Sequence, residues 1–225
     1  MGDGAGDRGE RRAVVVKIAL VGGTGKLGRG LALRWACADH EIVLGSRDPA
    51  RAQAAAAELA SNGKISGADY GSAVASSEVV VLTIPWSAHR DTASAISAGC
   101  AGKVVIDTTV PLNASRTGHA LEQGSAAEIL QKQLLPAARV VAGLHTIAAG
   151  VLADIGQSID SDVLVCGDDE DARKVALQLA EALPARAFDA GPLNAAAVLE
   201  RLTPLLIGLN KRYKRKHIGL RLSGL

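Results

Sequence analysis

The chain has 225 residues, 48% hydrophobic and 21% charged, the balance of an ordinary soluble globular protein. Its apolar runs are far shorter than the ~20 residues of a transmembrane helix and no signal-peptide pattern is visible, which argues against a membrane or secreted protein. Cys37, Cys100 and Cys166 are widely spaced, which argues against a disulfide framework or a zinc site and favours the cytoplasm.

The net charge of +2 is unevenly distributed. The last fifteen residues carry six Lys or Arg and no Asp or Glu, which leaves 19 bases against 23 acids in the rest of the chain. A locally basic end therefore follows a mildly acidic body. Such a run is either a solvated face or an edge that attracts anions.

Buried strands are expected where the chain is continuously apolar, and helices where the pattern is amphipathic or alanine-rich. Residues 1–12 have almost nothing to bury and are expected to form a disordered leader. In chain order we then predict strand Val14–Gly22, helix Lys26–Ala38, strand Glu41–Ser46, helix Pro49–Ser61, strand Val79–Pro85, helix Ala88–Ser97, strand Lys103–Thr109, helix Ser125–Leu135, strand Arg139–Leu144, strand Asp162–Cys166, helix Asp168–Leu183, strand Ala185–Asp189 and helix Ala195–Arg212. Pro204 is expected to kink or interrupt the last helix.

Strands that alternate with helices of this length predict βαβ units and a mostly parallel sheet. Right-handed crossovers then give a doubly wound α/β domain of the Rossmann kind. The last helix is expected to pack beside that sheet as part of a small C-terminal α/β lobe.

A glycine-rich turn follows the first predicted strand. Gly23, Gly25 and Gly28 form the pattern G-x-G-x-x-G between that strand and the next helix. Gly23 permits the tight turn, Gly25 lets backbone approach a diphosphate without a Cβ in the way, and Gly28 lets the helix pack close to the strand. The free N–H groups at the helix start favour the diphosphate. We predict a dinucleotide site, with a purely structural turn as the alternative.

The end of the second strand indicates which dinucleotide binds. An NAD enzyme usually has Asp or Glu there, for the ribose 2′-OH. This chain has Ser46 and Arg47, followed by Arg51. A hydroxyl and two guanidinium groups would bind a 2′-phosphate, and Asp48 is expected to cap or start the helix. NADP is therefore preferred, the alternative being that both arginines only serve surface solubility.

Ligands of such sheets lie beyond the carboxyl ends of the strands, where this chain has distinctive residues. Ile84 and Val110 are expected to pack against the ribose and nicotinamide. Pro85 and Pro111 are expected to stop their strands. Trp86 either borders the cofactor or packs within the fold.

His145 follows another predicted strand. It either orients or protonates a substrate ring, since its charge is adjustable near neutral pH, or is structural. The sequence has no Ser-His-Asp or Tyr-x-x-x-Lys pattern. Hydride transfer needs none, because cofactor carbons held ~3–3.5 Å apart react by positioning alone.

Seven segments, taken together, resemble a known family. They are IALVGGTGKLG (18–28), EIVLGSR (41–47), VLTIPW (81–86), LHTI (144–147), VCGDD (165–169), DAGPL (189–193) and RLTPL (201–205). They resemble the reductases that couple NADP to coenzyme F420, an 8-hydroxy-5-deazaflavin. The resemblance runs from about Lys17 to the C-terminus, and its later segments are far more specific than the glycine pattern.

The resemblance implies reversible hydride transfer between NADP(H) and coenzyme F420. It implies a homodimer, an NADP-binding Rossmann domain over 13–150, and a small domain over 151–225 that completes the deazaflavin cleft. Small-molecule coenzymes, not nucleic acid or membranes, are the expected partners. By position, the residues at the diphosphate are Thr24, Gly25, Lys26 and Leu27, and those at the 2′-phosphate are Ser46, Arg47 and Arg51. The residues bordering the cofactor are Ile84, Val110 and Ala149, and those near the deazaflavin are Ile147 and the candidate catalytic pair His145 and Thr203.

Two other functions stay open. One is an NADP-dependent ferric or flavin reductase, because related domains share this turn and these strand ends. The other is a non-catalytic NADP-binding redox sensor. Turnover of a deazaflavin with NADPH distinguishes the three.

Overall fold

The computed structural model describes residues 15–59, 63–134 and 138–225. The leader expected over 1–12, and the predicted ends of two helices at Ser61 and Leu135, lie outside these ranges. Within them, no helix combines the length and apolarity needed to cross a bilayer.

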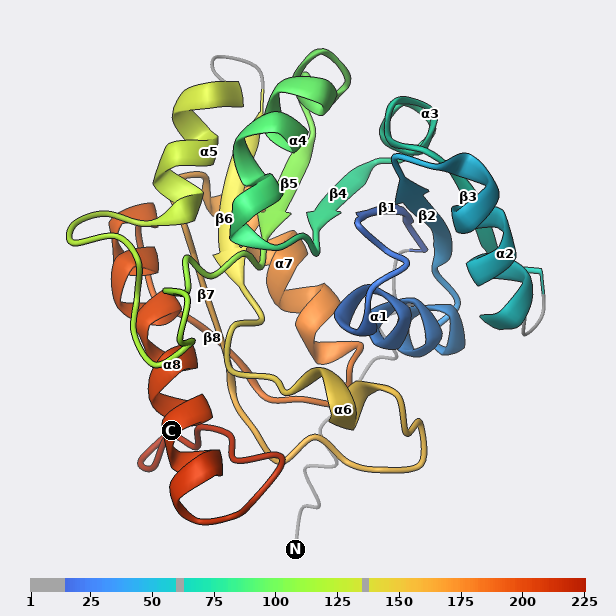
Figure 1. The fold of residues 1–225 in the computed structure, drawn as a ribbon. Helices are drawn as coiled ribbons and strands as arrows, with labels where there is room; N and C mark the ends of the chain where they lie inside the picture. Colours follow the sequence, from blue (N-terminus) through green and yellow to red (C-terminus); the bar gives the residue numbers. More distant parts are fainter. Residues whose placement is uncertain (1–14, 60–62, 135–137) are drawn as a thin grey trace, which may run out of the picture.

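A single eight-stranded sheet organises the chain, in the order β3-β2-β1-β4-β5-β6-β7-β8 (Figure 1). Its strands are β1 Lys17–Val21, β2 Glu41–Ser46, β3 Ile65–Asp69, β4 Val79–Leu82, β5 Val104–Asp107, β6 Arg139–Gly143, β7 Val163–Gly167 and β8 Ala187–Asp189. Strands β1 to β6 are parallel, β7 is antiparallel to β6, and β8 is parallel to β7. The predicted doubly wound, mostly parallel sheet is confirmed.

Helices cover both faces of the sheet (Figure 1). They are α1 Lys26–Cys37, α2 Pro49–Leu59, α3 Tyr70–Ala75, α4 His89–Ile96, α5 Ala126–Leu134, α6 Ala149–Leu152, α7 Glu170–Glu181 and α8 Ala196–Arg212, with short 3-10 turns at Trp86–Ala88, Ser97–Cys100 and Leu193–Ala195. Successive strand residues face opposite sides, so Ile18 and Leu20 join the core under α1, α2 and α7, whereas Ala19 and Val21 join the core under α3, α4, α5 and α8.

Two buried polar side chains fix α1 to later parts of the chain. The Trp35 indole donates to the Leu179 carbonyl at 2.8 Å, which joins α1 to α7. The Arg34 guanidinium donates to four backbone carbonyls, those of Val151, Leu152, Asp154 and Gln157. A buried guanidinium is costly unless its donors are satisfied, so these bonds hold α6 and the loop after it against α1.

The C-terminal end packs against the segment that precedes β7. The Asp162 carboxylate, fully buried, accepts two hydrogen bonds from Arg186 and one from the backbone N–H of Leu222. Leu220 donates to Ser161 Oγ and accepts from the Asp162 N–H. The last residues are therefore anchored beside the sheet.

Several boundaries differ from those predicted. Strands β4 and β5 end at Leu82 and Asp107, before Pro85 and Pro111, so the expectation that the prolines stop these strands was wrong. Helix α8 runs uninterrupted through Pro204, which lies in its interior. Strand β3 and helices α3 and α6 were not predicted from the sequence. The division at residue 150 stays a prediction, since the sheet continues across it into β7 and β8.

Candidate functional site

The turn between β1 and α1 has the geometry of an anion site. Gly22 has a φ of +83°, and the Gly25 N–H donates to its carbonyl at 3.1 Å, closing the turn. Gly25 is the N-cap of α1, where no side chain caps the first turn and no acidic residue occupies it. The first N–H groups of the helix, and its positive dipole end, are therefore left for an anion.

The three glycines of the pattern differ in the space around them. A Cβ on Gly28 would lie 2.5 Å from the Gly23 Cα, and one on Gly23 would lie 2.7 Å from the Leu20 carbonyl oxygen. These two glycines are therefore needed for packing. A Cβ on Gly25 would meet only the Gly22 carbonyl oxygen, at 3.4 Å. The open side of Gly25 is where a diphosphate would approach.

The end of β2 places Ser46, Arg47 and Arg51 together. Ser46 is buried, and its hydroxyl accepts from the Asp48 N–H at 3.2 Å. Asp48 Oδ1 accepts from the N–H groups of Ala50 and Arg51, which confirms its predicted capping role in α2. Both arginine side chains are exposed, as a 2′-phosphate would require.

A cavity of about 290 Å³ lies beside Arg47. Its lining residues are Arg47, Tyr70, Pro85, Ser87, Ala88, Asp91, Thr92 and Ala95. Burial raises the pKa of Tyr70, and the positive charges of Arg47 and Arg51 oppose that rise. The volume is close to the lower end of the ~300–1,000 Å³ range of small-molecule sites.

A buried ionisable pair supports the far end of the site. His89 Nε2 lies 2.9 Å from Asp107 Oδ2, both side chains being almost inaccessible. Asp107 Oδ1 also accepts from the Thr109 N–H at 2.9 Å, and the Trp86 indole packs on the His89 ring with centroids 5.1 Å apart. Trp86 thus has a packing role, and its contact with a cofactor stays a prediction.

His145 is buried, and among the described residues neither ring nitrogen has a hydrogen-bond partner of good geometry. Leu144 before it has a φ of +67°, an unusual backbone conformation that turns the chain away from β6. Burial lowers the pKa of His145 to about 4, against the opposing effects of the Asp107 charge and of a weak contact with the Thr109 backbone. The ring is therefore neutral at pH 7. Thr109 Oγ1 is also buried and has no hydrogen-bond partner in the part of the chain that the structure describes, so polar groups with unused hydrogen-bonding capacity lie at this end of the sheet.

The other predicted residues of this half of the site come from four separate segments. Ile84 packs over the glycine turn, since a Cβ on Gly22 would lie 2.6 Å from its Cγ2. Val110 follows Thr109 and is partly buried, and Ala149 begins α6. Thr203 on α8 donates to the His145 carbonyl at 3.0 Å.

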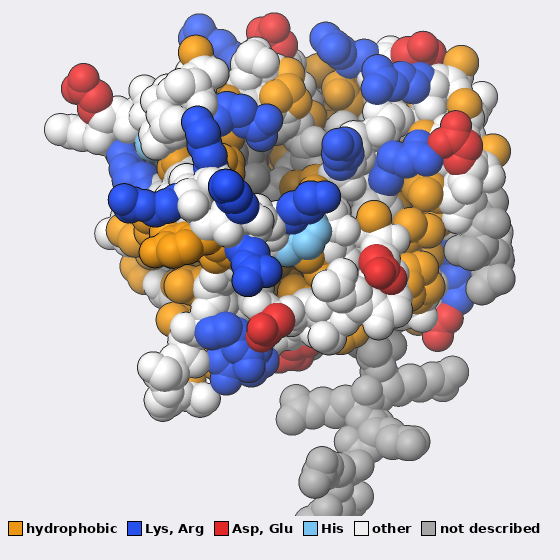
Figure 2. All heavy atoms as spheres, turned by 60° about the horizontal axis from the view of Figure 1, so that its bottom comes forward, with side chains coloured by type: hydrophobic (Ala, Val, Ile, Leu, Met, Phe, Trp, Pro, Cys, Tyr) orange, Lys and Arg blue, Asp and Glu red, His pale blue; other side chains and the backbone are white. Residues whose placement is uncertain are grey.

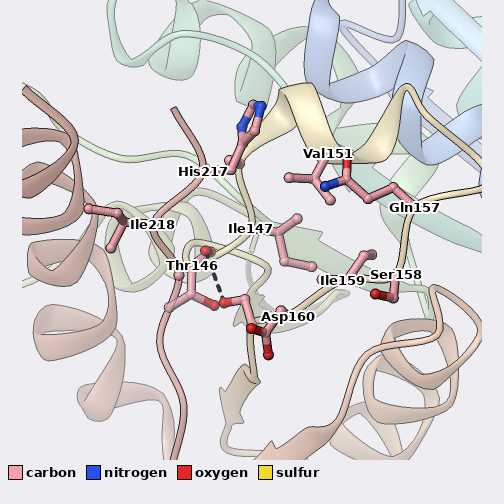
Figure 3. A pocket seen from close by; sticks show the side chains of 12 residues that line it. Thr146, Ile147, Val151, Gln157, Ser158, Ile159, Asp160, His217 and Ile218 are labelled. Atoms are coloured by element: carbon pink, nitrogen blue, oxygen red, sulfur yellow. Dashed lines mark hydrogen bonds between the residues drawn. The ribbon is translucent and has the colours of Figure 1, made fainter. Parts of the chain in front are cut away.

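Ile147 is buried and lines a small cavity of about 60 Å³, shown in Figure 3. Among the residues at the diphosphate turn, Thr24 is half-buried, Lys26 is exposed and Leu27 packs at the edge of the core. The structure brings Thr203 and His145 into direct contact. The residues predicted to bind the 2′-phosphate, Ser46, Arg47 and Arg51, form one cluster, and His145 and Thr203 belong to a second, separate cluster.

Sequence reasoning missed Tyr70 and Asp91 in the cavity beside Arg47. It also missed Glu200, a fully buried acid on α8 that accepts from the Ala126 and Ala127 N–H groups at the start of α5. An acid amid the apolar residues of a predicted helix was the only available signal for Glu200.

Comparison with known proteins identifies relatives along most of the chain. Residues 17–111 match the family model described as NADP oxidoreductase, coenzyme F420-dependent. The F420-dependent NADP reductase of Methanothermobacter thermautotrophicus is 41% identical, over 95% of this chain and 97% of the relative. That of Methanocaldococcus jannaschii is 37% identical, over 93% of this chain and 99% of the relative.

A solved structure shares the fold. A crystallised Arthrobacter protein, described as a candidate F420-dependent NADP reductase, matches with a TM-score of 0.81 and 27% identity, over 92% of this chain and 99% of that one. Because relatives at 37–41% identity match over more than nine-tenths of both chains, the resemblance seen in the sequence is confirmed, and this chain belongs to the family of F420-dependent NADP reductases.

Proposed function

We propose that this chain is an oxidoreductase that transfers a hydride reversibly between NADP(H) and coenzyme F420. The relatives at 37–41% identity are named for this pair of coenzymes, which favours it over a ferric or flavin reductase or a redox sensor. When bound, the nicotinamide and the deazaflavin supply the hydride donor and acceptor carbons. The protein has to bind, orient and desolvate them.

The dinucleotide half of the site lies along β1, α1 and β2. The backbone from Thr24 to Leu27 would hold the diphosphate, because Gly25 exposes backbone with no Cβ obstructing it. Ser46, Arg47 and Arg51 would hold the 2′-phosphate through charge-assisted hydrogen bonds. The cavity lined by Tyr70 and its neighbours would take the adenine.

The reactive half lies where β4, β5 and β6 end. Ile84, Trp86, Val110 and Ala149 would border the nicotinamide. His145, Ile147 and Thr203 would lie at the deazaflavin. Because burial keeps the His145 ring neutral at pH 7, it would donate or accept a hydrogen bond without delivering charge. The observation that best supports a polar ligand here is that, among the described residues, neither of its buried ring nitrogens has a hydrogen-bond partner of good geometry.

The test is a spectrophotometric assay in which NADPH bleaches the deazaflavin absorbance and NADP restores it. Arg47→Asp should raise the KM for NADPH by about 100-fold, because a carboxylate would replace a charge-assisted bond to the 2′-phosphate. The KM for the deazaflavin should stay unchanged. The same charge reversal at exposed Lys132 on α5 is the control. Absence of deazaflavin turnover in the unaltered protein would refute the proposal.

We also propose a homodimer that works in the cytoplasm, with residues 13–150 as the NADP-binding domain and 151–225 as the small domain. Val198 and Leu205 on α8 are 64% and 56% exposed and lie two turns apart on one face, which supports an apolar contact between copies. Val198→Glu with Leu205→Glu should then halve the mass measured by light scattering. The cytoplasmic assignment is supported by three unpaired cysteines.

A further inference from the structure

The C-terminal end of α8 and the loop after it carry a run of unpaired positive charge. The basic run consists of Lys211, Arg212, Lys214, Arg215 and Lys216, all exposed. Among the described residues, none of these five forms an ion pair, whereas Arg186 and Arg221, elsewhere in the C-terminal part, do. The helix dipole favours the first two bases, but nothing described neutralises the others. Five cations within residues 211–216 repel one another, and an anionic ligand would relieve that repulsion.

The basic run is held at both ends. Arg215 N–H donates to the Asn210 carbonyl at 2.9 Å, and Asn210 Oδ1 accepts from the Ile218 N–H at 3.0 Å. Beyond it, Leu220 and Leu222 are bonded to Ser161 and Asp162. The five charges are therefore presented on an anchored loop. Figure 2, which brings the bottom of Figure 1 forward, shows Lys and Arg side chains gathered on this face with fewer acids among them.

The anchored loop leads directly to the predicted deazaflavin end of the site. His217, Ile218 and Gly219 form one wall of the small cavity whose opposite side includes Ile147 (Figure 3). The His217 ring lies against Gly150 in α6, since a Cβ on that glycine would be 2.6 Å from its Cε1. Asp160, on the same cavity, lies 3.5 Å from Arg221, which offsets its charge. A ligand leaving the vicinity of Ile147 along this wall thus meets positive charge.

We propose that the basic run binds the acidic side chain of the deazaflavin coenzyme. This inference rests on the proposed function. Coenzyme F420 carries, beyond its flat ring, a phosphodiester and a chain of γ-linked glutamates, so its outer end is a row of carboxylates. NADP does not need these bases, because its 2′-phosphate and diphosphate already have Arg47, Arg51 and the turn at Gly25. The exposed bases act through long-range attraction, which salt weakens.

The test compares the complete coenzyme with a deazaflavin truncated at its ribityl chain. In the variant, Lys211, Lys214, Arg215 and Lys216 are all changed to Gln. The KM for the complete coenzyme, and its Kd from deazaflavin fluorescence, should rise about 10-fold at low ionic strength and less than about 2-fold at high salt. The values for the truncated deazaflavin and for NADPH should not change. A matched control changes Lys17, Lys64, Lys132 and Lys174 to Gln and should behave like the unaltered protein.

Three results would overturn the inference. One is an unchanged Kd for the complete coenzyme at low salt. Another is an equal rise for both deazaflavins. The third is displacement of the complete coenzyme by anionic vesicles or DNA at lower charge concentration than by a γ-glutamyl oligomer, which would assign the run to another partner. If the unaltered protein reduces the truncated deazaflavin but the four substitutions in the basic run leave the KM and Kd for the complete coenzyme unchanged, only this inference is refuted. If it reduces neither form, both proposals fall.

Discussion

Glu200 offers a test of how the structure holds its reactive half together. Its side chain is fully buried, accepts from the Ala126 and Ala127 N–H groups, and lies 3.2 Å from His119 Nε2. Burial raises the pKa of Glu200 to about 8 and lowers that of His119. Both are therefore mostly neutral at pH 7. His119 Nδ1 lies 3.0 Å from the Leu121 carbonyl oxygen and 3.3 Å from the Leu121 backbone nitrogen. The tautomer that donates to the closer carbonyl leaves Nε2 to accept the Glu200 proton.

This proton makes stability depend on pH. The folded chain holds it more tightly than the unfolded chain, whose carboxyl has a pKa of 4.5, so stability falls as pH rises from 4.5 to about 8. Histidines with lowered pKa values act in the opposite sense, but only below their unfolded value of 6.5. Between pH 6.5 and 8.0 the loss due to Glu200 is on the order of 1–2 kcal/mol, because the carboxyl is half ionised near the upper limit.

Glu200→Gln should remove this slope. An amide mimics the protonated acid: its oxygen accepts from the α5 N–H groups and its NH₂ donates to His119. We expect the variant to be within about 1 kcal/mol of the unaltered protein at pH 6.5 and relatively more stable at pH 8.0. Glu200→Ala should lose about 3–5 kcal/mol, since it leaves buried donors unpaired beside a cavity.

The measurement is urea unfolding at several pH values and one fixed protein concentration, because association would shift the apparent stability. Parallel pH profiles for the unaltered protein and Glu200→Gln would refute the reasoning. They would mean that the carboxyl is ionised throughout, with the His119 ring charged beside it.

Three further outcomes can be measured with the same assays. Gly25→Ala should change the free energy of unfolding by less than about 1 kcal/mol but raise the KM for NADPH at least about 10-fold. Gly28→Ala should instead lower the free energy of unfolding by about 2–3 kcal/mol. Equal losses of stability in the two variants would contradict the assignment of Gly25 to the ligand and of Gly28 to packing. His145→Gln should change kcat/KM by the same factor at pH 5.5 and pH 8, because the ring is neutral at both; a pH-dependent factor would indicate a protonated imidazole. Tyr70→Phe should raise the KM for NADPH about 3- to 10-fold and spare the deazaflavin, and an unchanged KM would exclude its hydroxyl from the 2′-phosphate site.

The central strands could be predicted because they are buried on both faces and therefore continuously apolar. β2 was predicted with its observed bounds, Glu41–Ser46. β3 was missed, because this edge strand reads Ile-Ser-Gly-Ala-Asp and contains one large apolar residue. The small residues of β3 allow α2 to pack closely on it, since a Cβ on Gly67 would lie 2.3 Å from the Ala52 backbone in α2. Missing β3 also hid Tyr70, the first residue after it.

The two halves of the proposed site also differ in how far they could be predicted from the sequence. The dinucleotide half is built from one β–α–β unit, so its residues are close in sequence and their spacing carries chemical meaning. The reactive half joins the ends of β4, β5 and β6 to α8, and only the family resemblance placed Ile147, Ala149 and Thr203 there. Spacing within the chain gives no information about such contacts, because they depend on strand order.

This difference in construction determines how mutations should act. Changes at Arg47 or Gly25 touch a local unit and should affect NADPH alone. Helix α8, in contrast, bonds to the His145 carbonyl through Thr203, holds the start of α5 through Glu200, and ends in the basic run. A single helix therefore links the backbone at His145, in the proposed reactive half, with the segment after β5 and with the basic run. Perturbing its middle should alter turnover with both deazaflavins, whereas perturbing its end should alter only the one with the acidic chain.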